Sequence, residues 1–217
     1  MNTFFEYWTR DKLRKKFGLK RVINHPLLTE WINSSCEITD FETLNLKYWR
    51  EKMLLYLDYW NEEEVKLKFI GNIISLVGYD SENISAFAER ELKGIVGGEE
   101  ISGFPDFMVA SGKQEVEAPF FFLHEYKKEL DNNSPDPAGQ CLAAMLLAYE
   151  LNLQIPKLCE KPIYGAYVIG RNCFFVILKN REFCISDAYV STHLDNLMDI
   201  FRILKVSKTQ INEIWGD

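Results

Sequence analysis

Two apolar segments joined by a polar stretch constrain this chain more than any other feature. The first covers residues 107–110 and directly follows Pro105-Asp106. The second covers residues 120–123 and runs into His124-Glu125-Tyr126-Lys127. Residues 111–119 between them are polar and turn-like, so the two apolar segments are predicted to pair as a β-hairpin with a long loop.

The register of this hairpin can be predicted from its centre. Residues equidistant from the turn face each other in an antiparallel pair, and the midpoint of 106 and 125 falls between Glu115 and Val116. Asp106 is therefore expected opposite Glu125. Side chains alternate along a strand, so Lys127 shares a face with Glu125. Two carboxylates and one ammonium at one end of a sheet indicate a divalent cation with a positioned lysine.

These residues carry a family resemblance. Pro105-Asp106, followed nineteen residues after the aspartate by Glu125-Tyr126-Lys127, resembles the motif of the PD-(D/E)xK nuclease superfamily. The resemblance implies an α/β (α+β) restriction-endonuclease-like core, in which helices flank a mixed central sheet that contains an antiparallel meander. It also implies that Asp106, Glu125 and the backbone carbonyl of Tyr126 hold Mg²⁺ or Mn²⁺, and that Lys127 positions the attacking water.

A helix is predicted over residues 61–78. Asn61 can cap it, Glu64 at its third position would complete a capping box, and Gly78 suits its C-terminal end. Its sequence is similar to the first helix of the nuclease domain in type I restriction motor subunits. That family usually has Thr-Arg where this chain has Val65-Lys66.

The same resemblance assigns a role to Glu62, because the type I family has a metal-site glutamate near the start of this helix. The alternative is that Glu62 and its two acidic neighbours only complement the helix dipole. A further helix is predicted over 137–152, with Asp136 as its cap. Many members of the superfamily place a glutamine on that helix, and Gln140 in its first turn matches it. The alternative for Gln140 is a polar surface residue.

The remaining elements follow from periodicity and turn signals. Residues 92–96 are expected to form a strand that turns at Gly97-Gly98-Glu99 into the Asp106 strand, which would complete the meander. Three more strands are expected within 162–190, and helices over 40–60, 193–206 and 207–215. We divide the chain into an N-terminal helical extension, 1–60, and a nuclease domain, 61–217. One continuous domain is the alternative.

Charge is distributed unevenly. The formal net charge is −7, yet residues 1–25 contain seven Lys or Arg against Glu6 and Asp11. An acidic total argues against a general nucleic-acid coat protein. The basic cluster Lys12, Arg14, Lys15 and Lys16 can contact phosphate, or it is simply the solvated face of a helix.

The composition indicates in which cellular compartment the protein is expected. An apolar content of 47% suits a packed core, and no apolar run has the length of a membrane span. The five cysteines lack C-x-x-C spacing, which disfavours a zinc site and favours free thiols. The first residues are amphipathic and charged, unlike a signal peptide. We expect a cytoplasmic protein without membrane contact.

The predicted activity is Mg²⁺-dependent hydrolysis of DNA phosphodiesters, with Asp106, Glu125, Lys127, Glu62 and Gln140 as catalytic residues. DNA is the expected partner, together with a targeting protein or further copies of the chain. Three alternatives stay open: a binding protein with little or no catalysis on the same fold, a nuclease that acts on RNA, and an exposed salt-bridge cluster of little energetic value.

Overall fold

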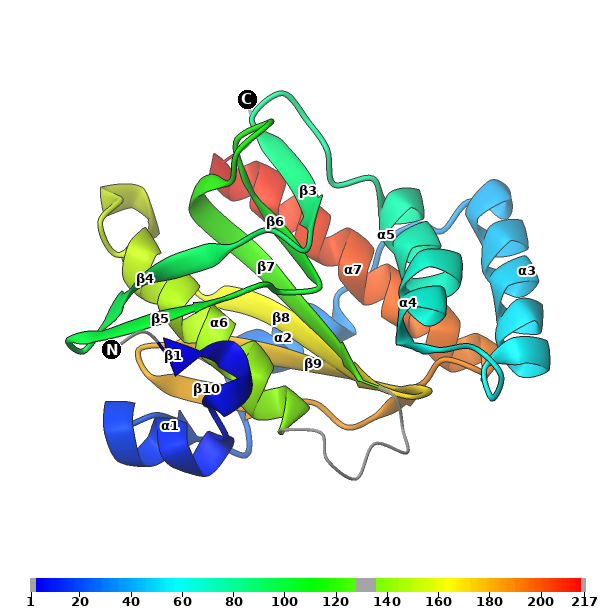
Figure 1. The fold of residues 1–217 in the computed structure, drawn as a ribbon. Coiled ribbons are helices and arrows are strands. Elements are labelled where there is room, and N and C mark those ends of the chain that lie inside the picture. Colours follow the sequence, from blue (N-terminus) through cyan, green and yellow to red (C-terminus); the bar gives the residue numbers. More distant parts are fainter. Residues whose placement is uncertain (1–2, 128–135, 216–217) are drawn as a thin grey trace.

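The computed structural model describes residues 3–127 and 136–215 and has a mixed sheet with helices on both faces (Figure 1). Seven strands lie side by side in the order β2-β10-β9-β8-β7-β6-β3, and β11 pairs with β9. Their bounds are β2 Lys20–Arg21, β3 Ile84–Ala88, β6 Phe107–Ser111, β7 Glu117–Lys127, β8 Ile163–Ile169, β9 Asn172–Lys179, β10 Glu182–Ile185 and β11 Tyr189–Val190. The β7–β8 and β2–β10 pairs are parallel and the others antiparallel. The expected mixed sheet with flanking helices is confirmed.

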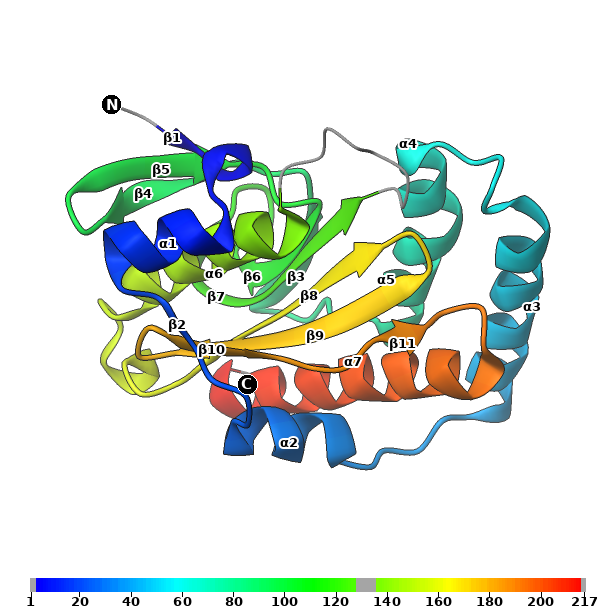
Figure 2. The same ribbon diagram turned by 90° about the horizontal axis from the view of Figure 1, so that it is seen from below.

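Figure 2 shows helices on opposite sides of the sheet. Helices α2 and α7 lie on one side, and α1 and α6 on the other. The bounds are α1 Arg10–Phe17, α2 Pro26–Asn33, α3 Asp40–Tyr56, α4 Glu62–Val65, α5 Gly71–Val77, α6 Pro137–Asn152 and α7 Leu194–Trp215, with short 3-10 turns at Phe5–Tyr7 and Pro156–Leu158. A π-helical segment, Lys66–Ile70, joins α4 to α5.

Strand β7 separates two hydrophobic cores because its side chains alternate between them. Phe122 and Tyr126 belong to the core beneath α2, α5 and α7, whereas Leu123 between them belongs to the core around α6. Helix α6 is buried on nearly all sides, since it packs against both the central sheet and a smaller one. Its Ala- and Leu-rich sequence suits this environment.

The expected meander is wrong in one respect. Residues Leu92–Val96 form β4, which turns at Gly97-Gly98 into β5, Glu99–Gly103. These two strands and β1, Thr3–Phe4, make a separate three-stranded sheet. The partner of β6 is β3 instead, so the antiparallel set is β3-β6-β7. The sequence pattern identified strand β4, but it missed β3 and β5.

The C-terminal region is one continuous helix, α7, instead of the two that we expected. Ser207, the expected break, is fully buried. Its hydroxyl donates to the carbonyl of Leu204 at 2.7 Å and contacts the Tyr79 hydroxyl at 2.9 Å. The serine is thus satisfied inside the helix, which continues through it.

Residues 1–60 are not only helical. Strand β1 pairs with β5, β2 pairs with β10, and Trp31 of α2 lies fully buried in the core beneath the central sheet. The N-terminal region therefore contributes strands to both sheets. Within 3–127 and 136–215, no helix has both the length and the apolar content needed to cross a bilayer.

Candidate active site

The predicted register between Asp106 and Glu125 is confirmed. Phe107 pairs with His124 in the β6–β7 ladder, so the preceding residue, Asp106, lies opposite Glu125. The backbone amide of Tyr126 donates to Oδ2 of Asp106 at 2.6 Å. Asp106 is therefore fixed against the end of β7.

The same ladder is irregular nearer the turn. Between Val109 and Ser111 β6 advances two residues, while their partners Phe122 and Glu117 are five residues apart on β7. The irregularities lie between the site and the loop. A regular ladder continued from the Ser111–Glu117 pair would place Asp106 opposite Phe122, so the irregularities shift the register by three residues and bring Glu125 opposite Asp106.

Five charged side chains meet at this end of the sheet and form what we call the charge cluster: Glu62, Lys66, Asp106, Glu125 and Lys127. Lys127 Nζ lies 3.3 Å from Glu125 Oε1 and 3.2 Å from Glu62 Oε1. Lys66 Nζ lies 3.7 Å from Glu62 Oε1 and 2.7 Å from Asp106 Oδ1. Positive and negative groups thus alternate from Glu125 to Asp106.

Glu62 reaches the cluster because of how its helix begins. Asn61 and Glu64 form the predicted capping box, which fixes the first turn of α4. From the first position of that turn, the Glu62 carboxylate contacts both lysines of the cluster. Glu62 therefore has specific partners beyond any effect on the helix dipole.

The cluster is largely withdrawn from solvent. Side-chain exposure is 5% for Glu125, 10% for Asp106, 17% for Lys66, 19% for Lys127 and 31% for Glu62. The alternative of an exposed salt-bridge cluster is therefore wrong. Charges held at this depth interact more strongly than surface pairs, and they cost more to bury.

Burial and charge shift the proton affinities of the cluster. Desolvation, followed by repulsion from Asp106, raises the pKa of Glu125 to about 8 even though Lys127 opposes the shift. Burial alone would lower the pKa of both lysines, but nearby carboxylates outweigh it and raise each pKa above its ordinary value. The Glu125 carboxyl therefore holds a proton at a higher pH than an ordinary glutamate does.

Lys66 is the site residue that the sequence analysis missed. Besides Asp106 and Glu62, its ammonium contacts Glu63 at 2.9 Å and Glu89 at 3.2 Å. The one local signal was its spacing of four from Glu62, which is shared by many surface ion pairs on helices. Its packing against Asp106 is a tertiary contact.

Gln140 lies in the first turn of α6 as expected, but it is buried instead of on the surface. Its Oε1 has no hydrogen-bond partner within the described ranges. No hydrogen bond joins its side chain to a described residue of the charge cluster. Its catalytic role stays a prediction.

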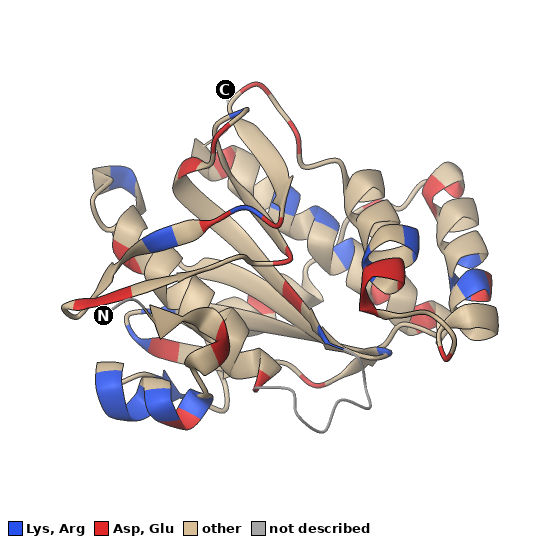
Figure 3. Cartoon of the chain, in the orientation of Figure 1, with Lys and Arg blue, Asp and Glu red and all other residues tan. Residues whose placement is uncertain are grey.

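The basic residues of α1 have partners of their own. Lys12 donates to the carbonyl of Tyr7 at 2.9 Å, Arg14 and Lys15 pair with Asp11, and Lys16 pairs with Glu99. Figure 3 shows this basic helix on the opposite side of the fold from the acidic start of α4. The structure does not bring these cations to the charge cluster.

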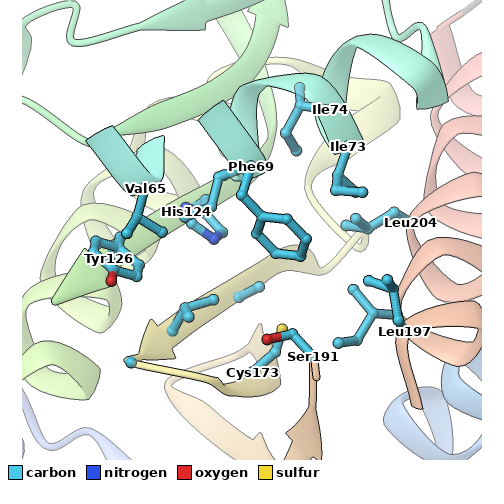
Figure 4. A pocket seen from close by; sticks show the side chains of 15 residues that line it. Val65, Phe69, Ile73, Ile74, His124, Tyr126, Cys173, Ser191, Leu197 and Leu204 are labelled. Carbon is cyan, nitrogen blue, oxygen red and sulfur yellow. The ribbon is translucent and has the colours of Figure 1, made fainter. Parts of the chain in front are cut away.

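His124 faces away from Glu125, as strand alternation predicts. It borders an apolar cavity of about 40 Å³, together with Phe69, Ile73 and Leu204 (Figure 4). Burial lowers the pKa of His124 to about 4, so the imidazole is neutral at physiological pH. His124 is buried, and it also borders a groove that Lys66 and Asp106 line.

No family model matches the chain, and no curated protein matches it either. Within the described part of the chain, no three His, Cys, Asp or Glu side chains are arranged as ligands of a single metal ion. In this conformation, the ammonium groups of Lys66 and Lys127 lie between the carboxylates of the cluster.

Proposed function

We propose that this protein is a metal-dependent nuclease of the PD-(D/E)xK type that hydrolyses phosphodiester bonds of DNA. The observation that carries the proposal is the convergence of four side chains: Asp106 directly before β6, Glu125 and Lys127 on β7, and Glu62 at the start of α4. A cytoplasmic location and a targeting partner or homo-oligomer belong to the same proposal.

The order of elements around these residues supports the proposal. A helical segment from α4 to α5 precedes the antiparallel strands β3, β6 and β7, and α6 then leads to β8, which pairs parallel with β7. This arrangement suits the restriction-endonuclease-like core that the motif resemblance implies. The two short strands β4 and β5 are an insertion between β3 and β6.

The donor chemistry of the cluster fits Mg²⁺ or Mn²⁺. Asp106, Glu125, Glu62 and the Tyr126 carbonyl offer oxygen atoms, which these hard cations prefer. The raised pKa of Glu125 reflects a buried carboxyl beside a second carboxylate, and a divalent cation would relieve that repulsion. When bound, such a cation lowers the pKa of a coordinated water and neutralises charge on the phosphate.

The protein's own groups have separate roles in this proposal. Asp106 is oriented by the Tyr126 amide, so its remaining oxygen is aimed at Lys66. Lys127, which contacts both Glu125 and Glu62, can orient or deprotonate a water and stabilise negative charge as it develops. Gln140 is assigned hydrogen bonding to the water or the nucleotide.

The test is cation-dependent cleavage. Wild-type protein is incubated with supercoiled plasmid, single-stranded DNA and RNA, each with Mg²⁺, Mn²⁺ or a chelator. Cleavage that requires the cation and is lost in Lys127→Ala supports the proposal. Lys68→Ala is the matched control, because Lys68 pairs with Glu64 outside the cluster. Cleavage of RNA alone would favour the RNA-directed alternative.

A binding protein with little or no catalysis is the second candidate, and the Lys66–Asp106 ion pair favours it. An ammonium at 2.7 Å already compensates the carboxylate that a catalytic cation would need. Absence of cleavage on all three substrates, together with retained binding of DNA in a mobility-shift assay, would support this candidate over the nuclease.

A further inference from the structure

We propose that Lys66 is a tethered counter-ion of the charge cluster, which competes with a divalent cation for Asp106 and withdraws to Glu63 and Glu89 when that cation binds. The inference rests on the proposed function for the identity of the cation. It assigns Lys66 the role of a positioning residue that controls when the carboxylates are free.

The contacts of Asp106 show why a cation and Lys66 compete. Oδ2 accepts the Tyr126 amide at 2.6 Å, and Oδ1 is held by Lys66 Nζ at 2.7 Å. Both oxygens are therefore engaged by positive or donor groups. A cation that binds Asp106 at Oδ1 has to displace the ammonium or share the oxygen with it at the cost of like-charge repulsion.

The charge balance leaves room for a further cation. Glu62, Glu63, Glu89, Asp106 and Glu125 surround the two ammonium groups of Lys66 and Lys127. With all five carboxyls ionised, an excess of three negative charges remains. Lys66 offsets part of this repulsion while no divalent cation is present, so it stabilises the close arrangement of the carboxylates.

Glu63 and Glu89 offer Lys66 alternative partners away from Asp106. Its second set of partners lies nearer the solvent, because the side chain of Glu63 is 71% exposed and that of Glu89 is 55% exposed, against 10% for Asp106. The lysine already contacts both at 2.9 and 3.2 Å. A rotation of its flexible side chain toward them breaks the inner ion pair while its charge stays compensated.

The backbone at Lys66 is specialised in a way that suits this role. Lys66 opens the π-helical segment, in which the amide of Gly71 donates to the Lys66 carbonyl. A Cβ at position 71 would lie 3.1 Å from that carbonyl oxygen, so the glycine permits the close approach. Single π turns within helices occur frequently at functional sites.

The test measures cation binding without relying on cleavage. Isothermal titration calorimetry with Mn²⁺ compares wild type with Lys66→Met, which keeps an unbranched side chain one heavy atom shorter and removes the charge. Loss of the competing ammonium should tighten Mn²⁺ binding by about tenfold or more, the effect that one neighbouring charge has on a carboxylate's proton affinity. Lys66→Arg, which keeps the charge, and Lys68→Met, which removes an outlying charge, should bind as wild type does.

A second neutral variant covers the case in which Lys66→Met does not fold. Lys66→Gln removes the charge but can still donate a hydrogen bond to Asp106, and it should also bind Mn²⁺ more tightly than wild type. Thermal unfolding in chelator should show a lower Tm for the neutral variants than for Lys66→Arg, because the carboxylates lose their counter-ion.

The outcomes separate this inference from the proposed function. Equal or weaker Mn²⁺ affinity in the neutral variants overturns the tethered counter-ion and leaves the nuclease proposal in place. Tighter affinity without cleavage of any nucleic acid supports the counter-ion and overturns the nuclease. If neither wild type nor the folded neutral variants bind Mn²⁺, Lys66 is only a structural ion-pair partner and both proposals fail.

Discussion

The backbone amide of Tyr126 and the carboxylate of Asp106 are joined by a 2.6 Å hydrogen bond that crosses from the end of β7 to the start of β6. This contact needs an oxygen acceptor at position 106 but no negative charge. The structural and electrostatic roles of Asp106 can therefore be separated by an amide substitution, which keeps the acceptor and removes the charge.

Asp106→Asn is expected to fold with a Tm close to that of wild type or slightly higher. The substitution leaves Lys66 with fewer partners, but it also removes the carboxylate that helps raise the pKa of Glu125. Cation binding and cleavage should both be abolished. Differential scanning calorimetry and Mn²⁺ titration check the two parts, and a Tm several degrees below wild type would show that Asp106 is mainly an ion-pair partner.

The raised pKa of Glu125 predicts how the free energy of unfolding changes with pH. Its pKa in the folded state is about 8, above the ordinary value of 4.5, so the folded state binds the extra proton between these values. The free energy of unfolding should then fall as pH rises through this window, by an amount on the order of a few kcal/mol. Glu125→Gln lacks the titration and should gain stability over wild type as pH rises from 5 to about 8.

The measurement is urea unfolding of both proteins at several pH values without divalent cations. Parallel pH profiles for wild type and Glu125→Gln would contradict the expected titration. Added Mn²⁺ should reduce the difference at the alkaline end, since a cation favours the ionised carboxylate.

The lowered pKa of His124 predicts that stability rises with pH in the acid range, opposite to the effect of Glu125. Burial lowers its pKa to about 4 from 6.5, so the unfolded state takes up a proton before the folded state does. Stability from this group is complete above pH 6.5 and is lost as pH falls toward 4, again on the order of a few kcal/mol. His124→Leu should remove this loss, and it should leave cleavage unchanged because strand alternation places the imidazole on the opposite face of β7 from Glu125 and Lys127. A large drop in cleavage with intact folding would place His124 in the catalytic machinery instead.

Divalent cations are expected to stabilise the folded protein. A cation that binds only the folded state adds about 1.4 kcal/mol when its concentration is about ten times its Kd. Tm should therefore rise with about 5 mM Mn²⁺ if the site binds in the millimolar range or tighter. The shift should vanish in Asp106→Asn and persist in Lys68→Ala, and no shift at tens of millimolar would argue against catalysis.

Much of the site could be predicted because its determinants are local. The capping box of Asn61 and Glu64 lies within four consecutive residues, and a polar loop between two apolar segments marks the hairpin of β6 and β7. The predicted register was right at the site because the irregularities shift it by three residues between the Ser111–Glu117 pair and Asp106, which the sequence pattern did not show.

The features that the sequence did not predict depend on tertiary contacts. Nothing in the residues around Lys66 shows that its side chain turns inward to Asp106, since Glu62–Lys66 spacing is typical of exposed helix pairs. Likewise, a serine favours the start of a helix by local preference, but the Ser207 hydroxyl is buried and bonded to the Leu204 carbonyl and the Tyr79 hydroxyl, and α7 continues through it.

The alternation of β7 also protects the fold against mispairing. His124 and Glu125 are adjacent, yet one faces the apolar cavity and the other the charge cluster. A slip of one residue would exchange them, which would push a carboxyl among Phe69 and Leu204 and leave Lys127 without its partner. Burying an unpaired polar group in this way costs several kcal/mol, on the order of the whole stability of a domain if the group stays charged. The residues proposed for chemistry therefore also disfavour a misaligned register of β7 during folding.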